Sequence, residues 1–213
     1  MRSNSINLSK SGKLTNQGGI EKVYDQSTEI TSLPPVNILV IDLEATCSND
    51  ESITGSSMEI IEIGACWVDP NGCILDTFQS FVRPVVNRVL TPFCTELTTI
   101  TQDKVDGAPT YDQIAPMLQE FSMLHVETHS AWASWGNYDR VQFDHDSRRH
   151  GIENPVEHLP HINLKKIFAK RRSIKRVGMM GALKICEIEH SGIHHRGLDD
   201  AINIAKILNA MRS

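Results

Sequence analysis

The chain has 213 residues, of which 40% are hydrophobic and 22% are charged, and its formal net charge is −5 at pH 7. These values are typical of a globular domain and exclude a fibrous or fully disordered chain. No apolar run approaches the roughly 20 residues that a membrane helix requires, and the N-terminal residues lack the apolar core of a secretory signal. The five cysteines have no disulfide-framework spacing, which favours a reducing compartment. We therefore expect a cytoplasmic protein without membrane contact.

The chain divides into two parts of different composition. Residues 1–35 are rich in Ser, Asn, Gly and Thr and show no apolar period, which predicts a flexible polar N-terminal tail. Residues 36–213 are predicted to form one folded domain. This domain opens with a continuous apolar run over residues 36–41, which is typical of a strand buried on both faces.

The following segments predict a hairpin and then alternating helices and strands. Two apolar runs, residues 58–68 and 73–82, are joined by a Pro-Asn-Gly turn and should pair as a hairpin. Short strands are expected at residues 131–135 and 162–164, and helices at residues 111–124, 137–150 and 197–212, the first interrupted by Pro116 and the second ended by Gly151. This order predicts an α/β fold with a mixed sheet flanked by helices.

Two carboxylates follow the first buried strand. Asp42 and Glu44 are alternate residues, so their side chains should point to the same face of the sheet. Adjacent acids that lose water repel each other unless a cation lies between them. Their oxygen ligands favour Mg²⁺ or Mn²⁺ over zinc. Two hydrated acids at a strand end would give the same short pattern.

Three further residues complete a larger motif. Asp139 lies at the start of a predicted helix, and His195 precedes Asp200 at the start of the last helix. In this order, the residues resemble the motif of the DEDDh 3′–5′ exonucleases, DnaQ-like enzymes of the RNase H-like superfamily. The flanking residues resemble the branch of the histone-mRNA exonuclease and the enhanced-RNAi proteins. The matching stretches are residues 41–47, 59–64, 81–84, 97–102, 135–139 and 195–200.

The resemblance implies a fold and a reaction for residues 36–213. The fold would be an RNase H-like mixed five-stranded sheet, with an antiparallel hairpin plus parallel strands, flanked by helices. The reaction would be hydrolysis of RNA from the 3′ end to 5′-mononucleotides, on single strands or 3′ overhangs, with DNA as a further substrate. Two Mg²⁺ or Mn²⁺ ions would serve as cofactors.

The resemblance also assigns a role to each residue of the motif. Asp42 would bridge both ions, Glu44 and Asp200 would complete one metal site, and Asp139 would hold the second ion through water. His195 would deprotonate the attacking water, because an imidazole with an ordinary pKa near 6.5 suits a base at neutral pH. His194 and Asp199 have the same spacing as His195 and Asp200, but only the latter pair has Leu198 and Ala201 at the family positions.

Four residues are expected to contact the 3′-terminal nucleotide. Phe93, in a loop-like stretch after a proline, and Tyr138 match family positions whose rings stack on the terminal base. Backbone groups near Ala45 and Thr46 would reach the ribose hydroxyls, by which a protein distinguishes RNA from DNA. Thr99 stands where the family has Gly, so a positive φ at this position would strain the backbone.

A basic segment near residue 170 predicts contacts with the nucleic-acid backbone. It holds seven basic residues and no acid on an otherwise acidic chain. These residues are Lys165, Lys166, Lys170, Arg171, Arg172, Lys175 and Arg176. A solvated helix face would have the same composition.

Three other functions remain compatible with the sequence. The same site would also serve an oligoribonuclease that acts on short oligonucleotides, or a catalytically weak RNA-binding pseudo-exonuclease. A transition-metal site is the third alternative, because Cys186, His190 and His194 are spaced by four residues and would share one face of a helix. Gly192 interrupts that helical pattern.

Overall fold

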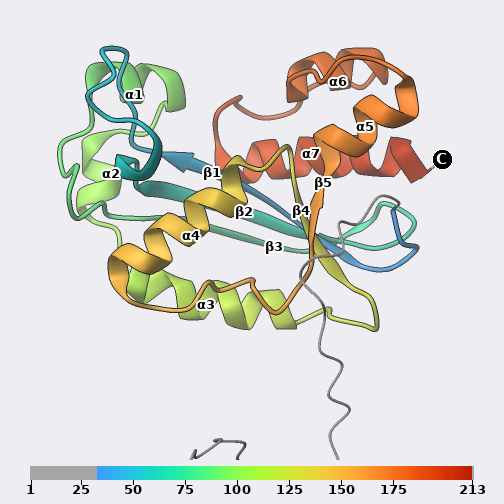
Figure 1. The fold of residues 1–213 in the computed structure, drawn as a ribbon, viewed down its shortest axis with the longest axis horizontal. Helices are drawn as coiled ribbons and strands as arrows, with labels where there is room; N and C mark the ends of the chain where they lie inside the picture. Colours follow the sequence, from blue (N-terminus) through green and yellow to red (C-terminus); the bar gives the residue numbers. More distant parts are fainter. Residues whose placement is uncertain (1–32, 213) are drawn as a thin grey trace, which may run out of the picture.

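The computed structural model describes residues 33–212, so the predicted tail over residues 1–35 lies almost entirely outside the described residues. Five strands form one sheet in the order β3-β2-β1-β4-β5 (Figure 1). They are β1 (Ile38–Ala45), β2 (Ile60–Val68), β3 (Ile74–Phe81), β4 (Ala131–Ser134) and β5 (His161–Asn163). The first three strands pair antiparallel, whereas β1, β4 and β5 are parallel to one another. The predicted mixed sheet is therefore confirmed.

Helices cover both faces of this sheet. They are α1 (Pro92–Thr98), α2 (Gln102–Asp106), α3 (Tyr111–Met123), α4 (Tyr138–His150), α5 (Leu164–Arg172), α6 (Met179–Ile185) and α7 (Gly197–Arg212), with a 3₁₀ turn, η1 (Gly55–Ser57). In Figure 1, α5, α6 and α7 lie on one side of the sheet, α3 and α4 lie on the other, and α1 and α2 stand near the end of β1. No helix within residues 33–212 is long and apolar enough to cross a bilayer.

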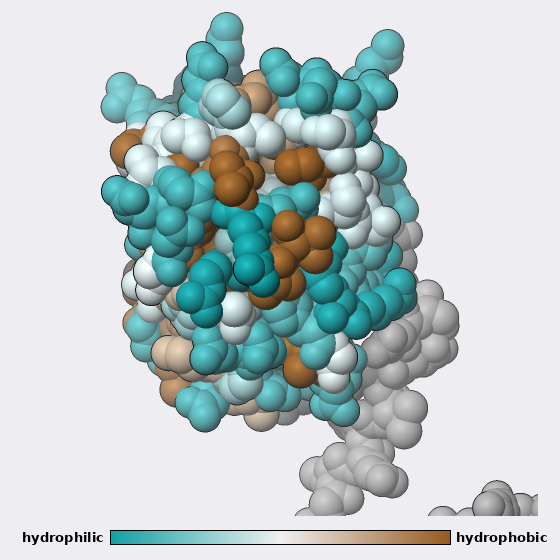
Figure 2. All heavy atoms as spheres, turned by 90° about the vertical axis from the view of Figure 1, so that its left-hand side faces the viewer, coloured by the Kyte–Doolittle hydropathy of each residue, from teal (hydrophilic) through white to brown (hydrophobic). Residues whose placement is uncertain are grey.

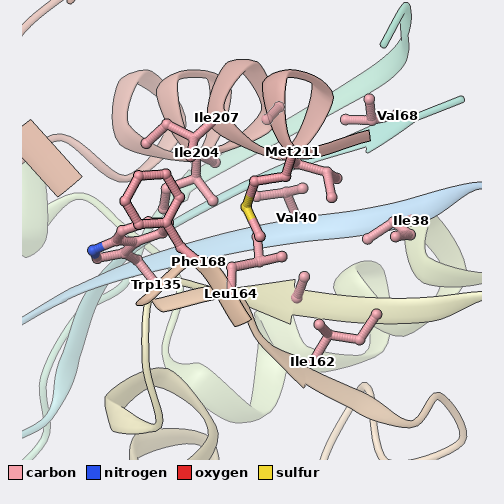
Figure 3. Close-up of a cluster of buried hydrophobic side chains, with 14 of the residues drawn as sticks. Ile38, Val40, Val68, Trp135, Ile162, Leu164, Phe168, Ile204, Ile207 and Met211 are labelled. Carbon is pink, nitrogen blue, oxygen red and sulfur yellow. The ribbon is translucent and has the colours of Figure 1, made fainter. Parts of the chain in front are cut away.

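The core has two halves, one on each face, because alternate residues of a strand point in opposite directions. Ile38 and Val40 of β1 belong to the cluster that α5, α6 and α7 cover (Figure 3). Leu39, Ile41 and Leu43 belong to the cluster under α3 and α4. The same alternation places the side chains of residues 42 and 44 on the α7 face.

The long elements match the expected ones, and the differences have local causes. Helix α3 continues through Pro116, whose side chain is exposed. Gly151 ends α4 in the left-handed conformation, with φ 67°, as predicted. The basic segment is only partly helical, because Ser173 ends α5 with φ 54°.

Phe93 lies in a helix, and its expected loop position is wrong. Thr91 caps the N-terminus of α1, because its side chain accepts a hydrogen bond from the N–H of Cys94. Pro92 fits the first helical position, where a backbone donor is not needed. Phe93 follows in the first turn. A helix of only 7 residues leaves too few apolar positions for a clear periodicity.

Candidate active site

The predicted acids converge at the carboxyl end of β1. Asp42 and Glu44 lie on the face of the sheet that carries α7, and Asp200 lies in the first turn of that helix. Asp139 lies in the first turn of α4, which follows the parallel strand β4. Glu44, Asp139 and Asp200 are only 8%, 5% and 4% exposed. Figure 2 views this end of the molecule and shows hydrophilic side chains in a hollow bordered by hydrophobic ones.

Asp139 is fixed to the strand that carries the first two acids. The pairing of β1 with β4 ends at Val40 and Ala133, so the backbone of β1 beyond that point has no β4 partner. The N–H of Leu43 instead donates to Asp139 Oδ1 over 3.1 Å. This bond holds the start of α4 against β1 and keeps the Asp139 carboxylate beside Asp42 and Glu44.

Helix α7 reaches the site through a backbone contact with β2. Gly64 pairs with Asp42 in the sheet, and a Cβ at Gly64 would lie only 1.9 Å from the carbonyl carbon of Gly197. Only glycine permits this approach, because any side chain at position 64 would occupy the space of the α7 backbone. The contact brings the first turn of α7, and therefore Asp200, over the end of β1.

A buried ion pair fixes the same junction. Glu62 is fully buried and accepts hydrogen bonds from Arg196 Nε, over 3.0 Å, and Arg196 Nη2, over 2.9 Å. It also accepts the backbone N–H of Gly197 over 3.0 Å. A bidentate contact of this kind fixes the orientation of Arg196 as well as its distance from Glu62. Glu62 and Arg196 are positioning residues that the sequence analysis did not assign, although an acid within the apolar run of β2 signals a buried partner.

His195 lies beside two of the acids. One ring nitrogen lies within 4.8 Å of a carboxylate oxygen of Glu44 and of one of Asp200. The backbone N–H of His195 donates to Asp200 Oδ2 over 3.0 Å, and its φ is 62°. A left-handed histidine is strained, and such strain persists only where surrounding contacts fix it. The structure thus joins all five predicted residues into one cluster.

The alternative pair of the motif is arranged differently. Asp199 points away from the cluster, because its carboxylate accepts the N–H of Ile193 over 2.8 Å. His194 does contact the cluster, since its Nδ1 lies 3.0 Å from Asp200 Oδ2 and its ring stacks on His195. The geometry therefore favours Asp200 over Asp199, while placing both histidines next to Asp200.

The acids repel one another strongly. Burial, followed by the charges of Asp139 and Glu44, holds the pKa of Asp42 well above its ordinary value. Burial and the charge of Asp200 raise the pKa of Glu44 to about 8. Burial also raises the pKa of Asp139 to about 6, although hydrogen bonds and the charge of Lys165 act in the opposite direction.

This electrostatic arrangement fits divalent cations. The cluster offers several carboxylate oxygens, the ligand type that Mg²⁺ and Mn²⁺ prefer. Positive charge among the acids would remove the repulsion that raises their pKa values. His195 is suited to a different role, because burial and the neighbouring His194 lower its pKa and keep its ring neutral at pH 7.

The two predicted stacking residues have different surroundings. Phe93 is half-buried and lines a pocket of about 330 Å³ together with residues 48–50 and Glu96. Tyr138 is 44% exposed, and its hydroxyl lies 3.8 Å from Met58 Sδ. The four acids do not line this pocket. The pocket includes Ser48, which follows the last residue of β1 by three positions.

Ala45 and Thr46 continue β1 but have partners within the protein. The N–H of Thr46 donates to the carbonyl of Glu59 over 2.8 Å, and its hydroxyl accepts the N–H of Glu59 over 2.9 Å. The carbonyl of Ala45 accepts a weak bond from Cys94 Sγ over 3.7 Å. The predicted ribose contacts by these two residues stay a prediction.

The basic residues of the predicted RNA-binding segment are not equivalent. Lys165, at the start of α5, lies close enough to Asp139 to lower its pKa. Arg171 donates to the carbonyl of Met211, and Arg172 lies over the ring of Phe168. The other members are partly or fully exposed: Lys166, Lys170, Lys175 and Arg176. The segment therefore begins at the acids and continues across the surface.

The helical transition-metal site is wrong in its geometry. Helix α6 ends at Ile185, and the residues from 186 to 196 form a loop. Cys186 packs against the core on the α7 face. His190 and His194 do approach each other, but through the fold of this loop, and their third neighbour is Asp200.

The fold and the cluster together define a class of nuclease. An acid pair on the central strand, an acid after the neighbouring parallel strand, and a His and an acid at the last helix form the DEDDh arrangement on an RNase H-like sheet. Residues 39–208 match the family model described as Exonuclease (RNase_T). The chain belongs to this exonuclease family.

Individual relatives place it in the ERI1 branch. ERI1 exoribonuclease 3 of Homo sapiens is 31% identical over 192 residues, which cover 85% of this chain and 56% of that protein. The 3′-5′ exonuclease eri1 of Schizosaccharomyces pombe is 27% identical over 203 residues, covering 83% and 68%. The nuclease domain of 3′hExo, described as a DEDDh family member bound to rAMP, has a TM-score of 0.73 at 30% identity, covering 82% and 90%. The chain spans about half the length of the ERI1 exoribonuclease 3 proteins.

Proposed function

We propose that the chain is a metal-dependent 3′–5′ exoribonuclease that releases 5′-mononucleotides from RNA. The observation that carries the proposal is the convergence of Asp42, Glu44, Asp139 and Asp200 with a neutral His195 at one end of the sheet. Membership of the exonuclease family and likeness to proteins named as exoribonucleases support it.

The four acids would hold two Mg²⁺ or Mn²⁺ ions. Two such ions would neutralise charge on the phosphate, stabilise the leaving oxygen and favour ionisation of the attacking water. Asp42 is suited to the shared position, because it lies on the central strand and both Asp139 and Glu44 raise its pKa. Asp139 is anchored by Leu43, and Asp200 by the N–H of His195, so both carboxylates are oriented before any ion binds.

His195 would act as the general base. Its lowered pKa leaves a ring nitrogen free to accept the proton of the attacking water at neutral pH. Water then adds to phosphorus as the P–O3′ bond breaks, leaving a 3′-hydroxyl on the shortened strand and a 5′-phosphate on the released nucleotide. The strained backbone at His195 and its bond to Asp200 hold the ring close to the acids.

The surroundings of the cluster suit a 3′ end of RNA. Phe93 and Tyr138 supply two aromatic rings that are not fully buried, and a stacked base contributes about 1–3 kcal/mol to binding. Lys165 lies next to Asp139, so the basic segment would contact the phosphates that precede the cleaved bond. Neutralising Lys170, Lys175 and Arg176 together should therefore reduce the salt dependence of RNA binding.

A digestion assay tests the proposal. Single-stranded RNA, single-stranded DNA and duplexes with 3′ overhangs, each labelled at the 5′ end, are incubated with and without Mg²⁺. We expect a ladder of products shortened from the 3′ end, faster on RNA, that depends on Mg²⁺. Activity confined to very short oligonucleotides would instead indicate an oligoribonuclease, and RNA binding without cleavage would indicate a pseudo-exonuclease.

His195→Ala provides the test of the base. Removal of a general base typically costs a factor of about 10²–10⁴ in rate, so we expect at least a loss of about 100-fold. His129→Gln is a matched control, because His129 is an exposed histidine outside the site. A variant that lacks His195 and cleaves at the normal rate would contradict the assigned role.

A further inference from the structure

Asp200 also faces two side chains that the proposed reaction does not use. His194 Nδ1 lies 3.0 Å from Asp200 Oδ2, and His190 Nε2 lies 3.6 Å from Oδ1 of the same carboxylate. One ligand atom from each of these three residues lies within 4.8 Å of the other two. Two imidazole nitrogens and one carboxylate therefore converge in a small volume beside the catalytic cluster.

His190 faces Asp200 but makes no hydrogen bond through Nε2 within the described part of the chain. Its side chain is 17% exposed, and Nε2 is buried without a hydrogen-bond partner among residues 33–212. A buried polar atom that is left unpaired costs free energy, and folded proteins rarely contain one. A cation between the two histidines and Asp200 would use this lone pair.

The loop that carries both histidines is held in place by α7. Asn203 donates to the carbonyl of Ser191 over 2.8 Å and accepts its N–H over 3.1 Å. The carboxylate of Asp199 accepts the N–H of Ile193, and it packs against Gly192 so closely that a Cβ there would lie 2.3 Å away. The third ligand is on the same helix, so the three donors keep their relative positions before an ion binds.

The donor set suits zinc better than magnesium. Mg²⁺ prefers oxygen ligands, whereas Zn²⁺ commonly binds two histidines and one carboxylate and keeps a fourth position open. In a tetrahedral site with metal–ligand bonds of about 2.0–2.1 Å, ligand atoms lie about 3.3 Å apart. One oxygen, Asp200 Oδ1, lies 3.3 Å from His194 Nδ1 and 3.6 Å from His190 Nε2, which is close to this value.

We propose that His190, His194 and Asp200 form a zinc-binding site whose occupancy inhibits the nuclease. The inhibition rests on the proposed function, since it requires Asp200 to serve the catalytic cations as well. A carboxylate that binds zinc is withdrawn from those cations. His194 also stacks on His195 with ring centres 3.9 Å apart, so an ion that fixes His194 restricts the general base too.

Calorimetric titration of the metal-free full chain with Zn²⁺ alone tests the site without reference to catalysis. We expect His190→Gln to lower the zinc affinity at least about tenfold. His129→Gln should leave the affinity unchanged, because His129 is exposed and distant in sequence. Asp42→Asn should also retain binding, since Asp42 is not one of the three ligands. Zinc binding that is lost with Asp42→Asn and kept with His190→Gln would overturn the site.

A nuclease assay at saturating Mg²⁺ then tests the inhibition. Without zinc, His190→Gln should cleave RNA at the wild-type rate. Added Zn²⁺ should inhibit the wild type, and the variant should require at least about ten times more zinc for the same inhibition. Equal sensitivity of the two proteins would overturn the inhibitory role. An absence of Mg²⁺-dependent cleavage would contradict the proposed function instead, and the calorimetric result would still decide the zinc site.

Discussion

The face of the sheet under α7 changes its character within a single strand. At the start of β1, Ile38 and Val40 pack with Ile204, Ile207 and Met211 in a cluster from which water is excluded (Figure 3). Two residues further along the same face, Asp42 and Glu44 begin the acidic cluster. The first region stabilises the fold, whereas the second holds mutually repelling carboxylates, whose repulsion is relieved by a bound cation or by protonation. The apolar residues of α7 therefore hold the helix on the sheet, and this packing keeps Asp200 near the other acids in spite of their repulsion.

The largest effect is expected from removing one charge at the polar end. Asp42→Asn should lower the rate of RNA cleavage by about 10⁴-fold, the scale seen when an essential catalytic group is removed. The metal-free variant should nevertheless be more stable at pH 8, by about 1 kcal/mol, because one of the mutually repelling charges is gone. Cleavage assays and urea unfolding measure the two effects. A variant that is both active and less stable would contradict the assignment of Asp42 to a cluster of mutually repelling catalytic acids.

At the apolar end, a substitution should lower the stability of the protein and leave its nuclease activity unchanged. Ile207→Ala removes a fully buried side chain and should lower the free energy of unfolding by about 2–5 kcal/mol. Cleavage at a temperature well below the melting midpoint should be retained, since Ile207 belongs to the apolar cluster and lies about two helical turns beyond Asp200 in α7. Met123→Ala is the matched control, because Met123 is exposed and should change stability by less than about 0.5 kcal/mol.

The pH dependence of stability should reveal the stored repulsion. A carboxylate whose pKa is raised by folding favours the native state below its ordinary pKa and loses this contribution as the pH rises through the raised value. The pKa of Glu44 is about 8 and that of Asp42 is also raised, so the metal-free protein should lose stability between about pH 4.5 and 8.

Magnesium should reverse that loss, because it binds the ionised acids. At 100 times its Kd, a ligand stabilises the native state by about 2.7 kcal/mol. The Mg²⁺-induced rise in melting temperature should therefore be larger at pH 8.5 than at pH 6. Thermal melts at both values, with Asp42→Asn as the control, measure it. A Mg²⁺-induced rise in melting temperature that is equal at both pH values would contradict repulsion between ionised acids as its cause.

The smallest effect concerns Thr99, at the end of α1. This exposed residue has a φ of 60°, so the strain predicted for a family glycine position is present. A left-handed conformation costs a residue with a Cβ about 1–2 kcal/mol. Thr99→Gly should raise the melting temperature by about 2–4 °C, whereas Thr95→Gly, within the same helix, should lower it. A Thr99→Gly variant that melts earlier would show that the threonine side chain offsets its strain.

Local patterns were sufficient to predict the strands and to place the first two acids on them. The apolar run of β1 and the alternation of its side chains place Asp42 and Glu44 on one face without any tertiary information. Asp139 and Asp200 are assigned through the resemblance to the DEDDh motif, because an acid in the first turn of a helix is common without any catalytic role.

The remaining features depend on contacts that local patterns do not report. The ion pair between Glu62 and Arg196 joins residues 134 positions apart, and it forms only once β2 and α7 are packed. The spacing of His190 and His194 suggested a helix, but Gly192 and the bonds of Asn203 fold the segment into a loop. Helical spacing is informative only where a helix exists, so the third neighbour of these histidines could not be identified from the sequence.

The contact between Gly64 and Gly197 has a consequence for exchanging parts between relatives. The backbones of β2 and α7 touch there with no side chain between them, so backbone atoms alone set the distance of α7 from the sheet. A hybrid that takes this helix from another family member should keep its reactive acid in place if both glycines are retained. If either glycine is replaced, the transplanted helix would lie farther from the sheet. A hybrid of this kind would fold but would have no nuclease activity.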